Sequence, residues 1–281
     1  MLKSRIKSRT DLPTAKDLPD SDDKPLDNEL HALMPHLLRS ILALIWADRY
    51  DWFFGTNMGW YYAPDQNPIV PDGFLSIGVS RILDHNLRLS YLTWQENDII
   101  PSLTIEIVSK TPGGEYKKKK QLYAELGVLY YIIYAPNRIR KPRLTIYKLQ
   151  NGEYELCDHN PIWMPEIGLG IGTELGSYNG IHREWLYWYN QQGERYLTPE
   201  EIARQEEFSR KQSEQALSQS EQALFQEQKA RLVAQQARLD AEEARGQAEK
   251  ARLQEQQARL QAEEKAAKLA EKLRELGIDI D

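Results

Sequence analysis

The C-terminal part of the chain carries a seven-residue repeat that suits a long helix and no globular core. Alanine recurs between residues 230 and 262 at alternating steps of four and three, with one interruption at Glu255. Leucines at 232, 239, 253 and 260 form a second stripe, with Gly246 in the missing place. This period predicts a helix that packs on a partner helix, from a second copy of the chain or another protein. The alternative is a single solvated helix held by Glu–Lys and Glu–Arg pairs, because alanine buries little area.

The globular core must therefore come from the rest of the chain. All seven tryptophans lie between Trp46 and Trp188, and the composition changes to Ala, Gln, Glu, Arg, Lys and Leu near residue 198. We expect a disordered arm over residues 1–26, one domain over 27–197 and the helical tail over 198–281. The arm contains Lys, Arg, Asp and Pro without the apolar run of a secretory signal.

Charge and cysteine content narrow the class of protein. Cys157 is the single cysteine, so no intramolecular disulfide argues for an oxidising compartment, and no apolar run approaches a membrane span. We expect a soluble cytoplasmic protein without a membrane partner. The net charge is −6, and residues 197–281 hold 14 basic and 18 acidic residues, which leaves the rest of the chain near −2. Any contact with nucleic acid must therefore be local.

The order of apolar segments predicts an α/β fold with a mixed central sheet. A helix is expected over residues 30–46, with Asp27 as its N-cap and Glu29 in its first turn. A second helix is expected over 115–126, ended by Gly127. Strands are expected within 51–62, 68–79, 101–110, 128–136 and the hairpin 143–157, whose turn is Asn151-Gly152. Residues 80–98, and the glycines of "GLGIG" at 168–172, are expected to form loops.

Two acids stand out by their context. Asp72 follows Pro71 directly before the apolar "GFLSIGV", and Glu106 interrupts an otherwise apolar strand. A buried carboxylate is unfavourable unless it is paired or binds a metal, and hard cations such as Mg²⁺ prefer carboxylate and carbonyl oxygens. The alternatives are an ordinary turn residue for Asp72 and a solvent-facing residue for Glu106.

Four consecutive lysines, residues 117–120, open the second helix. Leu122, Tyr123 and Leu126 mark its packed face, and Lys119 lies at the edge of that face. Lys119 is thus the lysine best placed to reach a site on the sheet, while the other three are expected to be solvated. The alternative is that the whole run is a solvated basic cluster.

Several motifs resemble one family in order and spacing. "IVPDGFLSIGV", "RLSYLTWQE", "PSLTIEIVSKTPGGEYKKKKQLYAELGVLYYIIYAPN" and the tail ending "LAEKLRELGIDID" are similar to the Uma-type restriction endonucleases, within the PD-(D/E)XK nuclease superfamily. The resemblance covers nearly the whole chain from about Asp27. It implies a restriction-endonuclease-like core, a mixed sheet flanked by helices, with motif acids at Asp72 and Glu106. Val108 occupies the last position of the usual E-x-K, and Lys119, paired with Tyr123 in K-x-x-x-Y, matches the lysine supplied by the following helix.

The resemblance also implies the chemistry. Asp72, Glu106 and the carbonyl of Ile107 would hold Mg²⁺ or Mn²⁺, with Glu29 matching a supplementary helical acid, and Lys119 would orient the attacking water for phosphodiester hydrolysis, in DNA. The chain departs from the family at Lys117, where an acid is common. Lys118 or Lys120 would serve if the helical register differs. The rival hypothesis is a catalytically degenerate scaffold that acts through its helical tail.

Other classes of site find no support in the sequence. The five histidines have no metal-binding spacing, and neither an H-E-x-x-H motif nor a Walker-type phosphate loop is present. Cys157 lies in the expected hairpin and is interpreted as structural. The glycines at 168–172 lack the strand-then-helix context of a dinucleotide site.

Overall fold

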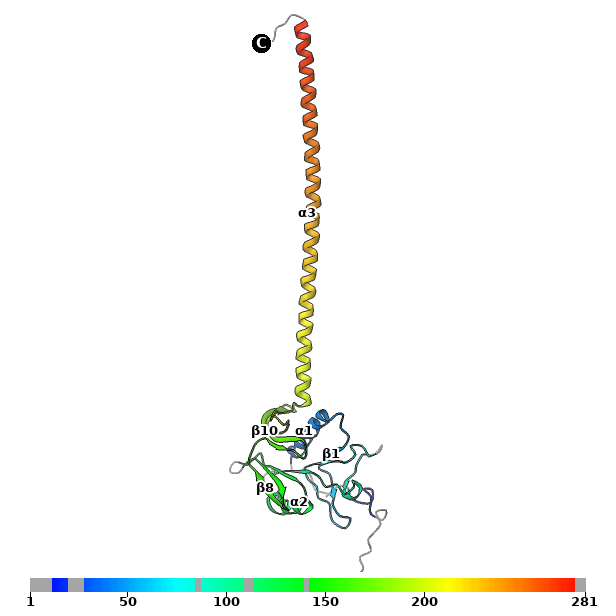
Figure 1. The fold of residues 1–281 in the computed structure, drawn as a ribbon, viewed down its shortest axis with the longest axis vertical. Coiled ribbons are helices and arrows are strands. Elements are labelled where there is room, and N and C mark those ends of the chain that lie inside the picture. Colours follow the sequence, from blue (N-terminus) through cyan, green and yellow to red (C-terminus); the bar gives the residue numbers. More distant parts are fainter. Residues whose placement is uncertain (1–11, 20–27, 84–86, 109–113, 139–141, 276–281) are drawn as a thin grey trace, which may run out of the picture. The chain divides into compact units, whose positions relative to one another are not determined.

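The computed structural model describes residues 12–19, 28–83, 87–108, 114–138 and 142–275 (Figure 1). The chain divides into two compact units, residues 1–205 and 206–281. The predicted boundary near residue 198 stays a prediction, as does the disorder of residues 1–26, most of which lie outside the described residues. Within 12–19 the carbonyl of Pro13 accepts a hydrogen bond from the Trp94 indole, and that of Pro19 accepts one from the Tyr61 hydroxyl.

A six-stranded mixed sheet is the centre of the first unit, which confirms the predicted fold class. The strands in spatial order are β1 (Trp52–Thr56), β3 (Gly73–Ile77), β5 (Leu103–Ile107), β6 (Tyr130–Tyr134), β7 (Leu144–Gln150) and β8 (Glu153–Cys157). Strands β5 and β6 are parallel and all other neighbours are antiparallel. Asn151 and Gly152 both have positive φ angles at the β7–β8 turn, as the predicted hairpin requires.

Helix α1 (Leu30–Ile45) and a second sheet cover one face of the central sheet. The second sheet has the order β11 (Ile181–Tyr189), β10 (Leu169–Tyr178) and β9 (Ile162–Met164). Alternate residues of β5, namely Leu103, Ile105 and Ile107, join this core with the apolar face of α1. Helix α1 begins one residue after Glu29, and the Asn28 side chain accepts a hydrogen bond from the backbone N–H of Leu30 at 2.9 Å. The expected cap Asp27 lies outside the described residues.

A second apolar cluster lies on the opposite face of the sheet. It contains Val108 of the β5 end together with Trp60, Tyr123 and Tyr131. The lysine segment crosses from β5 to β6 as a π-helical turn, η3 (Glu115–Lys119), followed by α2 (Lys120–Leu126). Gly127 ends α2 with a φ of 84°, as predicted. This crossover joins the parallel strands and carries Lys119 to the face of the sheet opposite α1.

Two segments expected to be loops contain regular structure. Residues 80–98 include β4 (Tyr91–Leu92), which pairs with β2 (Trp60–Tyr61), and a short 3₁₀ turn, η2 (Thr93–Gln95). Gly170 and Gly172 lie inside β10, where a Cβ on Gly172 would come within 2.5 Å of the Asn160 side-chain oxygen. These glycines allow close approach within a strand, so the loop prediction was wrong.

Helix α3 (Pro199–Glu275) runs for 77 residues (Figure 1). Its side chains beyond residue 202 are exposed almost without interruption, including Leu232, Leu239, Leu253 and Leu260. The predicted long helix is therefore present. Its packing against a partner helix stays a prediction.

Candidate active site

Asp72 lies where the chain enters β3, beside the C-terminal end of β5. The pairing of Gly73 with Ile105, continued by one residue, brings Asp72 opposite Glu106. One Asp72 oxygen accepts a hydrogen bond from the Ile107 backbone N–H at 2.6 Å, and the other lies 2.9 Å from the His31 ring nitrogen Nδ1. Asp72 therefore joins β5 to α1, which is more than an ordinary turn residue does.

Glu106 is a buried carboxylate with two specific partners. It is 2% exposed, which excludes the solvent-facing alternative. Strand alternation turns it away from the α1 side of the sheet, toward α2. Its Oε2 accepts a hydrogen bond from the Lys119 ammonium at 2.7 Å, and its Oε1 accepts one from the Tyr123 hydroxyl at 2.7 Å. The Tyr123 ring in turn stacks on Trp60, which fixes its orientation.

The surroundings of Glu106 oppose its negative charge. Burial raises the pKa of Glu106, the charge of Lys119 lowers it, the charge of Asp72 raises it, and the hydrogen bonds from Lys119 and Tyr123 lower it, which leaves the pKa at about 7. For Lys119, burial alone would lower the pKa, but Glu106, Asp72 and Glu115 outweigh that effect and raise it. The two acids and the lysine thus form one electrostatically coupled group, held in a site that tolerates excess negative charge poorly.

The four lysines occupy different environments. Lys117 and Lys118 are exposed, whereas Lys119 is half-buried against Glu106 and the Lys120 ammonium lies 3.9 Å from the centroid of the Tyr147 ring. The backbone N–H of Lys119 donates to the carbonyl of Gly114 at 3.1 Å, the bond of a π turn. Lys119 is therefore the member of the run that contacts Glu106, and its catalytic role stays a prediction. The expectation that Lys120 is solvated was wrong, because Lys120 is half-buried over Tyr147 of β7.

The first helix reaches Asp72 through a residue that sequence reasoning missed. Glu29 is exposed, and no contact joins it to Asp72 or Glu106 in the described part of the chain. His31 is buried instead, and Asn57 donates a hydrogen bond to its backbone carbonyl at 3.1 Å. The available signal was a polar residue three positions before Met34 and seven before Leu38, on the apolar face of the helix.

Comparison with known proteins identifies the family. Residues 23–176 match the Uma2 family, described as "Putative restriction endonuclease". The chain belongs to the Uma2 family. A similar solved structure is the "Crystal structure of a putative nuclease belonging to DUF820" from Anabaena variabilis, with 16% sequence identity and a TM-score of 0.40, which covers 55% of this chain and 90% of that one. Among curated proteins, no match to this Uma2 chain was found.

The two acids of this Uma2 domain fit a hard divalent cation. Mg²⁺ is commonly bound through one or two carboxylates and keeps several waters. Burial raises the pKa of Glu106 and repulsion from Asp72 adds to that effect, and a cation beside the two acids would relieve the repulsion. No group of three or more His, Cys, Asp or Glu side chains that could hold a metal lies within the described ranges. Binding of a metal by Asp72, Glu106 and the carbonyl of Ile107 stays a prediction.

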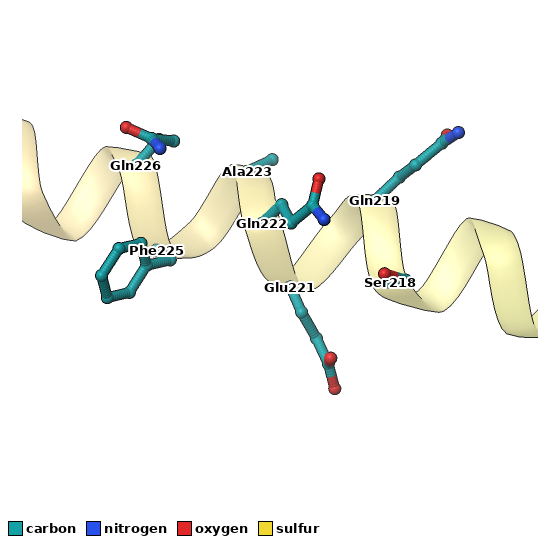
Figure 2. A pocket seen from close by; sticks show the side chains of 7 residues that line it. All are labelled: Ser218, Gln219, Glu221, Gln222, Ala223, Phe225 and Gln226. Atoms are coloured by element: carbon teal, nitrogen blue, oxygen red, sulfur yellow. The ribbon is translucent and has the colours of Figure 1, made fainter.

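Other features of the Uma2 chain do not form a comparable site. A surface hollow beside α3 is lined by seven residues of this one helix, between Ser218 and Gln226. Figure 2 shows these side chains, with the Phe225 ring directed away from the helix. A single helix encloses no cavity, so no polar groups converge there. None of the helices in the described ranges combines the length and apolar character needed to span a bilayer.

Proposed function

We propose that the Uma2 domain of this chain is a metal-dependent endonuclease that hydrolyses phosphodiester bonds in DNA. The observation that carries the proposal is that Asp72, at the start of β3, lies opposite Glu106, near the end of β5, and that Glu106 contacts the ammonium of Lys119 from the following helix. Coupled groups with a raised carboxyl pKa are common at catalytic sites. The match to the Uma2 family supports the reaction class.

Each residue has a defined task in this proposal. Asp72 and Glu106 hold Mg²⁺ or Mn²⁺, which when bound activates water and neutralises phosphate charge. His31 and the Ile107 N–H keep the Asp72 carboxylate in one orientation, and Tyr123 does the same for Glu106. The Lys119 ammonium supplies positive charge where negative charge develops at phosphorus.

The test is divalent-dependent nicking of supercoiled plasmid by the purified chain. We expect Asp72→Asn and Glu106→Gln to abolish cleavage while the thermal unfolding midpoint remains well defined. The matched control is Glu125→Gln, which makes the same acid-to-amide change at an exposed position of α2 and should retain full activity. Cleavage that is equal in wild type and both site variants would come from a contaminating nuclease. Inactivity of the wild type with every nucleic acid and metal would favour the scaffold hypothesis.

A further inference from the structure

A groove follows the free edge of the central sheet. Its volume is about 380 Å³, and it is lined by the edge strand β1, by α1 and by residues 81–83 and 87–88. The lining residues are Arg39, Phe53, Phe54, Gly55, Thr56, Met58, Arg81, Ile82, Leu83, Leu87 and Arg88. None of the described residues that line the groove is acidic. Residues 1–196 carry a net charge near −2, so the three arginines are a local concentration of positive charge.

Arg39 and Arg81, two of the three arginines in the groove, can offer their positive charge to a ligand. Arg88 is neutralised by a buried ion pair with Glu96, at 2.6 Å between Nε and the carboxylate oxygen. Arg39 is exposed and Arg81 is half-buried, and neither has an acidic partner among the residues that the structure describes. Burial lowers the pKa of Arg81, and the nearby charges of Arg39 and Arg88 lower it further. An anion in the groove would relieve this repulsion.

The groove ends next to the candidate active site. Thr56, in its lining, pairs directly with Gly73 of β3. The next residue, Asn57, donates its backbone N–H to the carbonyl of Asp72 at 3.2 Å. A linear ligand bound along β1 would therefore extend as far as Asp72.

Apolar side chains share the groove with the charges. Leu87 is 92% exposed, Ile82 is 67% exposed and Leu83 is 51% exposed, all in the segment after β3. Proteins that hold nucleic acid without reading its sequence combine cations along the backbone with apolar or aromatic contacts to bases. The planar guanidinium group also matches phosphate oxygens in a bidentate manner.

We propose that Arg39 and Arg81 form a phosphate-binding subsite that guides a DNA strand along β1 to Asp72. The proposal rests on the proposed function for the choice of DNA, since an anionic peptide would also satisfy the charge. The continuity of the groove with the acids favours the nucleic acid. Because phosphate contacts carry no base information, the subsite positions the strand and does not select a sequence.

The test compares binding of a short fluorescein-labelled DNA duplex in Ca²⁺ by fluorescence anisotropy over a range of salt concentrations. We expect the double variant Arg39→Gln/Arg81→Gln to bind about tenfold more weakly, and the slope of log K against log salt to fall by roughly two units, close to one per phosphate contact. The single variant Arg81→Lys keeps the charge and should retain most of the affinity. It also separates loss of charge from loss of the Arg81 contact with the Trp52 ring.

The matched control removes the same charge elsewhere in the domain. Arg143→Gln/Arg183→Gln lies away from the groove, where Arg143 pairs with Glu184 and Arg183 stacks on Trp185, and should leave the salt slope unchanged. Equal loss in both double variants would overturn the subsite, because only net charge would matter. So would unchanged binding by the groove variant, or a wild type that binds an acidic peptide and no DNA. Wild-type binding without cleavage would sink the nuclease proposal and leave the subsite standing.

Discussion

At the scale of single residues, the chemistry of the site depends on a burial that most carboxylates avoid. Glu106 is nearly inaccessible to solvent, yet its two oxygens meet one cation and one hydroxyl. A buried charge with partial compensation is unfavourable in the absence of further partners. The ionised form of Glu106 therefore lowers the stability of the folded domain.

The first prediction follows from the raised pKa of Glu106. Its pKa is 4.5 in the unfolded chain and about 7 in the folded one. The folded state thus binds the proton more tightly. Stability is highest, with respect to this group, below pH 4.5 and is lost as the pH rises through 7, by roughly 3 kcal/mol at most. Urea unfolding in the presence of a chelator should show that loss in wild type relative to Glu106→Gln.

The difference in the free energy of unfolding between wild type and Glu106→Gln reports on Glu106, because all other titrating groups are the same in both proteins. If this difference in the free energy of unfolding stayed constant from pH 4.5 to above pH 7, the prediction would be wrong. Added Mg²⁺ should reduce this difference at high pH, because a cation that binds the folded wild type stabilises the folded state.

The second prediction concerns the lysine run. Lys119→Ala should reduce the single-turnover cleavage rate by about 10²–10³, the usual effect of losing one group that stabilises developing charge. DNA affinity in Ca²⁺ should change little, because the interaction is made mainly in the transition state. The control is Lys118→Ala, which removes an exposed charge one residue away and should retain turnover.

Lys120→Ala tests the register of the same helix. It removes a cation–π contact with Tyr147, so we expect a stability loss of about 1 kcal/mol and normal cleavage. If the large rate loss occurred at Lys118 or Lys120, the assignment of Lys119 would be incorrect. If all the lysine variants lost DNA affinity equally and kept their cleavage rates, the lysine run would be only a basic patch that binds DNA.

At the scale of elements, sequence reasoning succeeded where a pattern is local. The β5 strand and the lysine helix follow from adjacent apolar residues and from Gly127, and the Glu106–Lys119 contact follows from a short crossover. His31 was missed because its role depends on how α1 is placed against a strand end 41 residues away. The glycines of β10 were misassigned because their reason is the close approach of Asn160, a contact no local pattern reveals.

The third prediction uses two glycines with opposite roles in helices. Gly127 ends α2 with a left-handed φ of 84°, so Gly127→Ala should destabilise the domain by about 1 kcal/mol. Gly246 lies inside α3 with no heavy atom within 4 Å of an added Cβ, so Gly246→Ala should stabilise the helix by about 0.5–1 kcal/mol. Thermal melts followed by circular dichroism would measure both. The same sign for the two substitutions would refute the assignment of these conformations.

At the scale of the whole molecule, the helical tail either forms a coiled coil or is a solvated single helix. The fourth prediction favours association, because Leu253 and Leu260 are each more than half exposed in one chain and lie seven residues apart. Sedimentation equilibrium should show a wild-type oligomer, and Leu253→Glu/Leu260→Glu should yield monomers. The control Gln254→Glu/Gln261→Glu adds the same charge at neighbouring positions. A monomeric wild type would leave the single solvated helix as the explanation.

The separation of the site residues along the chain also orders their assembly in time. The Glu106–Lys119 contact closes a loop of 13 residues, whereas Asp72 must find Ile107 across 35 and His31 across 41. Short loops close at lower entropic cost, so the β5–α2–β6 segment is expected to form in the folding transition state and the docking of α1 to follow. In stopped-flow experiments Ile132→Val on β6 should mainly slow folding, and Leu42→Ala on α1 should mainly speed unfolding. The reverse partition would mean that α1 nucleates the domain, and that Asp72 acquires its orientation before Glu106 acquires its lysine.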